Sequence, residues 1–128
     1  MINKIKKGSL IIAHGSQVKQ FNSDFLKLVG QIKRIVKPIL ITAAFLECGK
    51  PSITSGMEFL EKKRVTEVLV IPYFLGAGKH ITFHIPQILK SWQKTRPQIK
   101  IKIIKPIGQD KIMLKLISSL IQKNLIHS

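Results

Sequence analysis

Four short apolar runs alternate along this chain with stretches whose apolar residues recur at helical spacing. The runs, each interpreted as a β-strand, cover 9–13, 39–45, 67–73 and 98–105. Strands separated by helices pair in parallel through right-handed crossovers, and continuous apolar runs suit strands that are covered on both faces. The run at 67–73 is the most apolar and is expected to be central, whereas the alternating lysines of 98–105 suit an edge strand. We therefore predict an α/β fold, with a four-stranded parallel sheet flanked by helices on both faces.

The predicted helices begin and end at residues with the chemistry of helix termini. Ser, Asn and Asp side chains cap N-termini, and proline or a basic cluster is common where a helix ends. Because Pro86 disfavours helical backbone in the residue before it, we expect His84 to lie in a loop. The first predicted helix runs from Asn22 or Ser23 to Pro38, and the second from Pro51-Ser52 to the cluster Lys62, Lys63 and Arg64. The third begins at Ile85-Pro86. The fourth begins at Asp110 and is amphipathic, with the apolar residues Met113, Leu116, Ile117, Leu120 and Ile121.

Length and cysteine content limit the class of protein. At 128 residues, 45% of them hydrophobic, the chain suits one globular domain, and we expect residues 1–128 to form it. Cys48 is the only cysteine, which excludes an intramolecular disulfide and a CxxC motif and fits a reducing compartment. No run approaches the roughly 20 apolar residues that span a bilayer, and none after the basic start resembles a signal peptide. We expect a cytoplasmic or organelle-stromal protein without a membrane span.

The charge of the chain is strongly unbalanced. Lys and Arg number 22 against 6 Asp and Glu, a formal net charge of +16. Such a field attracts polyanions, whether nucleic acid, an anionic membrane, or a small ligand with many carboxylates or phosphates, although compositional bias can produce the same excess. Nucleic-acid binding is the weaker alternative, because the basic residues lack interleaved aromatic side chains and no helix-turn-helix, zinc-finger or RNP pattern is present.

Three chemically active residues each follow an apolar run. His14 comes after 9–13, Glu47 after 39–45, and His80 a few residues after 67–73. Ligands of open α/β sheets bind beyond the carboxyl ends of the strands, where these side chains would converge. Two imidazoles and a carboxylate there could hold a divalent metal ion or move protons. The alternatives are a His14 that only bonds locally and a Glu47 that pairs with a lysine.

The loops around the two histidines are the candidate ligand-binding segments. Gly15 allows a tight turn, and the amides of Gly15 and Ser16 could face an anionic ligand. The loop Gly76-Ala77-Gly78-Lys79 fails the Walker pattern and better suits a flat ligand that approaches the backbone, unless it is a plain connection. No GxSxG motif surrounds Ser16, so hydrolase chemistry is set aside. Of the other candidates, Cys48 is expected to be a half-buried packing residue and His127 to lie in the tail.

Three ordered motifs together resemble a known family. They are LIIAHGS at 10–16, AFLE at 44–47 with PSI at 51–53, and IPYFLGAGKH at 71–80 with IP at 85–86. The chain is similar to the small CbiX-type sirohydrochlorin chelatases, class II chelatases of cobalamin and sirohaem biosynthesis, over nearly its whole length. The resemblance implies a chelatase-like domain, one per chain, that pairs as a homodimer. One departure is His84, at a position that is commonly acidic in the family.

The resemblance also implies a reaction and roles for the candidate residues. Co²⁺, Fe²⁺ or Ni²⁺ is expected to enter the anionic tetrapyrrole sirohydrochlorin without ATP, as a substrate and with no tightly bound cofactor. His14 and His80 would be the metal ligands and Glu47 a catalytic carboxylate, either a proton acceptor or a residue that orients a histidine. Gly15, Ser16, Gly76, Ala77, Gly78 and Lys79 would bind the substrate. The metal stays open, and a non-catalytic metal carrier or sensor remains an alternative.

Overall fold

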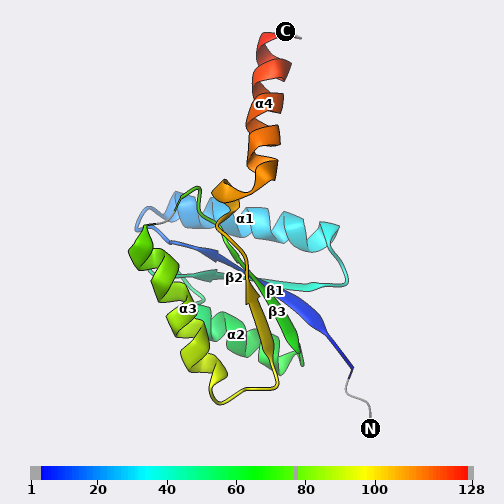
Figure 1. Ribbon diagram of the computed structural model, residues 1–128, viewed down its shortest axis with the longest axis vertical. Helices are drawn as coiled ribbons and strands as arrows, with labels where there is room; N and C mark the ends of the chain where they lie inside the picture. The colour runs from blue at the N-terminus through cyan, green and yellow to red at the C-terminus, as the bar shows by residue number, and fades with distance from the viewer. Residues whose placement is uncertain (1–3, 77, 127–128) are drawn as a thin grey trace.

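A computed structural model describes residues 4–76 and 78–126, and the side chain of His80 lies outside the described part. Four parallel strands form one sheet in the order β2-β1-β3-β4 (Figure 1). Their bounds are β1 (Lys7–Ala13), β2 (Leu40–Phe45), β3 (Glu67–Pro72) and β4 (Lys100–Ile103). The predicted α/β fold is therefore confirmed, with β3 in the interior of the sheet and β4 at its edge.

Helices cover both faces of the sheet. The helix α1 (Lys19–Ile35) packs on β2, and Phe25 and Val29 join the apolar side chains of that face. The helices α2 (Ile53–Lys62) and α3 (Lys79–Gln93) cover the other face, over a core that includes Leu10, Met57 and Leu89. This arrangement leaves the carboxyl edge of the sheet to the loops that lead into α1, α2 and α3.

The start of α1 differs from the prediction. The helix begins at Lys19 rather than at Asn22 or Ser23, with Val18 at the N-cap position and no side-chain cap. The Ser16 hydroxyl instead accepts a hydrogen bond from the Val18 amide at 3.0 Å. Asn22 thus lies inside the first turn, where its side chain can reach the loop before the helix. The predicted caps Ser52 of α2 and Asp110 of the last helix are confirmed.

The prediction of a loop at His84 was wrong. The helix α3 begins at Lys79 and continues through Pro86, so His80 and His84 lie one turn apart on it. Burial outweighs the local preference of the residue before proline, because Ile85, Leu89 and Trp92 all pack into the core. The Arg96 guanidinium stacks 4.2 Å from the Trp92 ring and bonds Glu61 of α2 at 3.1 Å, which joins the ends of the two helices.

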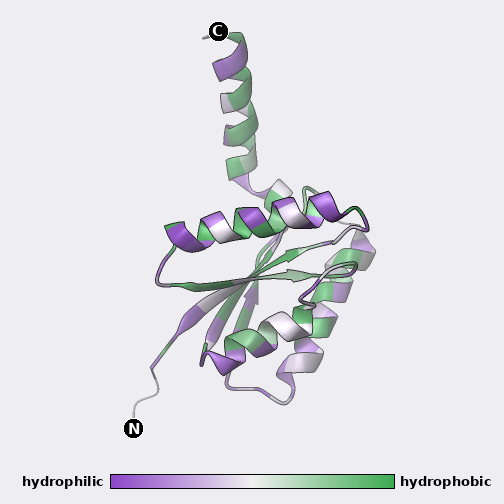
Figure 2. Ribbon diagram, turned by 180° about the vertical axis from the view of Figure 1, so that it is seen from behind, coloured by the Kyte–Doolittle hydropathy of each residue, from purple (hydrophilic) through white to green (hydrophobic). Residues whose placement is uncertain are grey.

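The last helix projects away from the sheet. The chain leaves β4 through the short helix η1 (Ile107–Gln109) and enters α4 (Lys111–Leu125), which extends beyond the body of the molecule (Figure 1). No residue of α4 is buried, although Figure 2 shows that much of its surface is hydrophobic. The apolar face predicted for this helix therefore has no partner within the described part of its own chain. Within that part, too, no helix is both long and apolar enough to cross a membrane.

Candidate active site at the carboxyl edge of the sheet

His14 directly follows β1 and is half-buried at the carboxyl edge. Its ring packs edge-on to Phe74, with centroids 6.4 Å apart, and its Nδ1 donates a hydrogen bond to the Gly15 carbonyl oxygen at 3.2 Å. Because a carbonyl oxygen can only accept, this contact assigns the proton of a neutral imidazole to Nδ1. The Nε2 lone pair is then the one available to a metal ion or an acid.

Glu47 lies beside His14 on the neighbouring loop. Its carboxylate Oε1 is 3.6 Å from His14 Nδ1, and its side chain is 59% exposed. Its amide donates to the His14 carbonyl at 3.0 Å, which extends the pairing of β1 and β2 past the last residues of both strands. Within the described residues the side chain beside the Glu47 carboxylate is therefore His14, and no lysine pairs with it.

Gly15 allows the two loops to approach closely. Its φ is +93°, a backbone conformation that costs L side chains energy, and an added Cβ would overlap the Glu47 carbonyl oxygen. Glycine at this position therefore serves the packing of the His14 loop against the Glu47 loop. The sequence had suggested a tight turn and a loop amide that could face a ligand, but not this packing.

The other predicted site residues lie along the same edge. Gly78 is the N-cap residue of α3, and Lys79 begins the helix with an exposed side chain. Gly76 and Gly78 have open space where a Cβ would stand. Ala77, the side chain of His80 and His127 fall outside the described residues. His84 is exposed on α3, and Cys48 is exposed rather than half-buried. Among the described residues, no group of three or more His, Cys, Asp or Glu side chains could hold a metal ion.

A shallow pocket of 460 Å³ opens beside His14. The β1–α1 loop, the first turns of α1 and the residue after β3 form its walls. Sequence reasoning had proposed three of these residues, His14, Gly15 and Ser16, and had placed Asn22 at the start of a helix. The lining residues are His14, Gly15, Ser16, Phe21, Asn22, Asp24, Phe25 and Tyr73.

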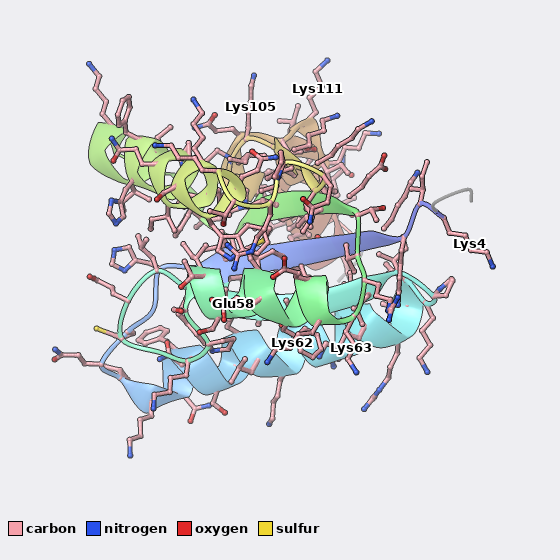
Figure 3. All side chains as sticks on the ribbon, turned by 90° about the horizontal axis from the view of Figure 1, so that it is seen from below. Lys4, Glu58, Lys62, Lys63, Lys105 and Lys111 are labelled. Atoms are coloured by element: carbon pink, nitrogen blue, oxygen red, sulfur yellow. The ribbon has the colours of Figure 1, made fainter. Side chains whose placement is uncertain are left out.

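Lysines extend from both the end of α2 and the segment after β4. In Figure 3, Lys62 and Lys63 lie at the end of α2, near the middle of the view, whereas Lys105 and Lys111 extend from its upper rim. A chain that binds nucleic acid through charge concentrates its basic residues on one face or along one helix. These four lysines come from two separate parts of the chain and do not lie along one helix.

Comparison with known proteins identifies the family. The CbiX family model matches residues 8–124. The chain belongs to the CbiX family. This result confirms the resemblance inferred from the three sequence motifs.

Named relatives include short and long chelatases. A sirohydrochlorin cobaltochelatase of Sulfolobus acidocaldarius is 29% identical over 118 residues, and the match covers 92% of this chain and 92% of that protein. A sirohydrochlorin ferrochelatase of Bacillus subtilis is 28% identical over 87% of this chain, which spans only 42% of that protein. The CbiX chain thus has the length of the archaeal enzyme and about half the length of the bacterial one.

Solved structures share the fold. SirB of Bacillus subtilis subspecies spizizenii, a sirohydrochlorin chelatase in complex with cobalt, is 28% identical, with a TM-score of 0.82 over 94% of this chain and 51% of that one. A CbiX protein of Marinobacter aquaeolei VT8, a cobalamin biosynthesis protein, superimposes with a TM-score of 0.80 at 23% identity and covers 95% of this chain and 99% of its own.

Proposed function

We propose that this protein is a sirohydrochlorin chelatase that inserts one divalent metal ion, Co²⁺, Fe²⁺ or Ni²⁺, into the tetrapyrrole without ATP. The observation that carries the proposal is the His14–Glu47 pair, in which Nδ1 faces Gly15 and Glu47 and Nε2 remains available to a ligand. Membership of the CbiX family and the names of its relatives support the same reaction. The ion is a substrate of this reaction, and no tightly bound cofactor is needed.

His14 and His80 are proposed to hold the incoming ion. Neutral imidazole nitrogen is a good ligand for these first-row metals, and the hydrogen bond at Nδ1 keeps His14 in the tautomer that binds through Nε2. The first turn of α3 carries His80 and follows β3, the neighbour of β1 in the sheet. An ion held by two imidazole nitrogens keeps other coordination positions open. The pyrrole nitrogens can occupy these positions and then replace the imidazoles.

Glu47 is proposed to accept protons during insertion. Two pyrrole N–H bonds break and bonds from nitrogen to the metal form, so two protons leave for each ion inserted. The exposed carboxylate next to His14 can take such a proton and release it to water. The same carboxylate can orient the imidazole, because Oε1 lies on the Nδ1 side of the ring.

The remaining edge residues are proposed to receive the macrocycle. The open space at Gly76 and Gly78 lets a flat ring approach the backbone, and Ala77 lies between them. Lys79 can attract the carboxylates of sirohydrochlorin, and the amides of Gly15 and Ser16 can bind them. We further propose that residues 1–128 act as a single domain in the cytoplasm or an organelle stroma.

An absorbance assay with sirohydrochlorin and Co²⁺, Fe²⁺ or Ni²⁺ tests the function. We expect many turnovers per protein chain, measured as loss of the free-base spectrum. His14→Ala and His80→Ala should abolish this activity, whereas Lys90→Ala, at an exposed position of α3, should leave it unchanged. Rates equal to the uncatalysed background would overturn the proposal, and metal binding without turnover would favour the carrier or sensor alternative.

We also propose that the protein is a homodimer and that α4 of each chain packs on the other chain. Eight apolar residues of this region are exposed, and Ile112 is 69% and Leu120 is 51% accessible. On the body, Leu69 of β3 is 37% exposed on the face that α1 covers at β2. The eight residues are Ile112, Leu114, Leu116, Ile117, Leu120, Ile121, Leu125 and Ile126.

The surface area supports a second copy as the occupant. The chain exposes 9580 Å², whereas a compact monomer of its mass exposes roughly 6,900 Å². The excess is larger than the about 800 Å² per partner that a standard interface buries. An α4 that has no partner among the described residues and the exposed Leu69 on the sheet, both in one chain, can contact each other reciprocally in a closed twofold pair.

Contacts at the N-terminus of α4 hold the start of this helix, and the helix points away from the rest of its own chain. The Gly108 amide of η1 donates to the Phe74 carbonyl at 2.9 Å, and a Cβ on Gly108 would overlap the Leu75 carbonyl oxygen. The Asp110 side chain then caps α4 through the Ile112 amide at 2.9 Å. These contacts hold the start of the helix, which supports the proposal that its apolar face packs on a second chain.

Sedimentation equilibrium of the full chain tests the dimer. We expect a dimer for the wild type and a monomer for Leu120→Glu, at the middle of the apolar face. Gln122→Glu adds the same charge at the middle of the polar face and should remain dimeric. A wild-type monomer at high concentration would overturn the pairing and leave α4 to fold back on its own chain.

A further inference from the structure

Asn22 connects the two loops that carry His14 and Glu47. The Ser16 amide donates to Asn22 Oδ1 at 3.0 Å, and Asn22 Nδ2 donates to the Ser16 carbonyl at 3.0 Å. Nδ2 also donates to the Cys48 carbonyl at 2.6 Å. One amide side chain in the first turn of α1 thus binds the residue two after His14 and the residue directly after Glu47.

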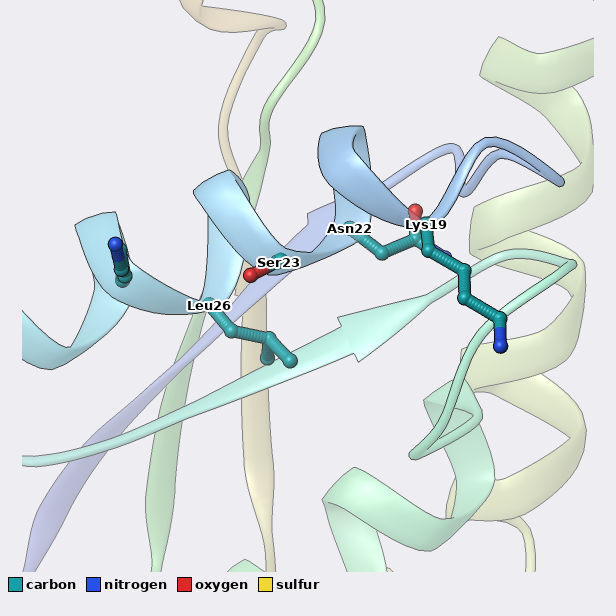
Figure 4. Close-up of a pocket in the computed structure, with 5 residues that line it drawn as sticks. Lys19, Asn22, Ser23 and Leu26 are labelled. Atoms are coloured by element: carbon teal, nitrogen blue, oxygen red, sulfur yellow. The ribbon is translucent and has the colours of Figure 1, made fainter.

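The position of Asn22 on the helix makes this bridge possible. Figure 4 shows Asn22 in line with Lys19, Ser23 and Leu26 along α1, where a shallow pocket of 540 Å³ lies beside it. On its other side Asn22 lines the pocket that contains His14. The half-buried amide therefore stands between these two depressions, and its donors point to loop carbonyls rather than to open solvent.

The bridged loops also have other contacts. The Glu47 amide bonds the His14 carbonyl, Gly15 lies against the Glu47 carbonyl, and the Glu47 carboxylate lies 3.6 Å from His14 Nδ1. Among the described residues, the hydrogen bond from Asn22 is the one that reaches the Cys48 carbonyl from α1. Cys48 has a positive φ of 54°, a sparsely populated conformation for a residue other than glycine. The bond from Asn22 holds the carbonyl of this residue and so holds the loop that presents Glu47.

We infer that Asn22 is a positioning residue that keeps the His14 imidazole against the Gly15 carbonyl and the Glu47 carboxylate. This inference deepens the proposed chelatase function and rests on it for its catalytic consequence. Asn22 acts through the loops and needs no contact with the ion or the tetrapyrrole. Loss of the bridge lets the loops separate, so that the Nδ1 proton is no longer held and both imidazole tautomers become populated.

Two substitutions test the hydrogen-bond donors of Asn22 apart from the size of its side chain. Asn22→Ala removes all three hydrogen bonds. Asn22→Asp keeps the size and the acceptor for the Ser16 amide, but it places a carboxylate oxygen against two carbonyl oxygens. Asn124→Ala is the matched control, because the Asn124 side chain makes one bond, to the Leu120 carbonyl, on α4.

The primary measurement is the ¹⁵N spectrum of the histidine side chains, recorded at a pH where imidazole is neutral. We expect His14 to be the Nδ1–H tautomer in the wild type and in Asn124→Ala, and a mixture in both Asn22 variants. Co²⁺ titration without tetrapyrrole should show binding about 10-fold weaker in the Asn22 variants, the usual effect of losing support behind a metal ligand. Thermal unfolding identifies any variant that fails to fold.

The outcomes distinguish this inference from the proposed function. An unchanged His14 tautomer and unchanged Co²⁺ affinity in folded Asn22→Asp would overturn the positioning role even if the protein is an active chelatase. A tautomer change together with weaker Co²⁺ binding supports the role even if no chelatase turnover is found. Equal losses in Asn124→Ala would also count against it, because the effect would then not depend on the bridge.

Discussion

Two glycine-containing loops at the carboxyl edge of the sheet differ in how much space surrounds them. After β1, Gly15 has a positive φ and touches the Glu47 loop so closely that no side chain fits. After β3, Gly76 and Gly78 are exposed, and outside their chain neighbours no atom of the described residues lies within 4 Å of an added Cβ. The first glycine is required by the packing of the folded protein. The other two are not required by packing against the described residues and leave their backbone accessible.

The comparison indicates that the two loops have different roles in the proposed site. The loop after β1 is preorganised by hydrogen bonds from Asn22 and by contact with Glu47, as suits the side that holds a small ion in a fixed geometry. The loop after β3 is open, as suits the side that receives a large planar substrate. Variants in the two loops should therefore differ in kind as well as in size.

The largest effect is expected from Gly15→Ala. The methyl group requires a strained backbone and pushes against the Glu47 carbonyl, so we expect a loss of about 2 kcal/mol or more in the free energy of unfolding, measured in urea. Displacement of His14 should lower kcat/KM for chelation about 100-fold. A Gly15→Ala variant with normal stability and activity would break the comparison, because the first loop would then be as open as the second.

Glu47→Gln should have the next largest effect. The amide keeps the size of the side chain but loses its charge and its capacity to accept a proton, so we expect kcat to fall about 10-fold with stability unchanged. The matched control is Glu58→Gln, an exposed carboxylate on α2 (Figure 3), which should retain full activity. Equal activity of both variants would assign Glu47 no part in the chemistry.

Gly76→Ala should affect binding and leave the fold intact. An added methyl group meets open space, and alanine restricts the unfolded chain, so the free energy of unfolding should rise by about 0.5 kcal/mol. KM for sirohydrochlorin should rise about threefold, a difference of under 1 kcal/mol in binding. Unchanged KM would show that the macrocycle does not approach this backbone.

Lys79→Gln should have the smallest effect. Lys79 is exposed at the start of α3, and removing one charge from a surface site should raise KM for sirohydrochlorin about twofold at low salt. The difference should disappear as salt screens the attraction, while kcat stays constant. A KM that is independent of salt in the wild type would exclude electrostatic capture of the substrate.

Local sequence patterns predicted the strands, the edge position of β4 and the caps Ser52 and Asp110, because each depends on neighbouring residues. These patterns failed where contacts between residues far apart in the sequence determine the structure. Burial of Ile85 on the core extends α3 through Pro86 and brings His84 onto the helix. The exposed apolar face of α4 also has no local signature that separates it from a buried one.

The sequence predicted which residue types form the candidate site, but only part of their arrangement in space. His14 and Glu47 stand out because each follows an apolar run, and their contact follows from the pairing of β1 with β2. The bridge from Asn22 joins residues 26 positions apart and depends on where α1 begins. A pattern that misplaced the start of α1 by three residues could not find it.

The stacked pair of Trp92 and Arg96 gives the molecule an optical reporter. Trp92 is the only tryptophan, is buried on α3, and within the described residues its indole nitrogen has no hydrogen-bond partner. The guanidinium over its ring depends on the bond to Glu61 of α2, so its fluorescence senses how these two helices pack. A variant at the opposite end of α3 can therefore be judged from its emission, which separates a changed site from a loosened scaffold.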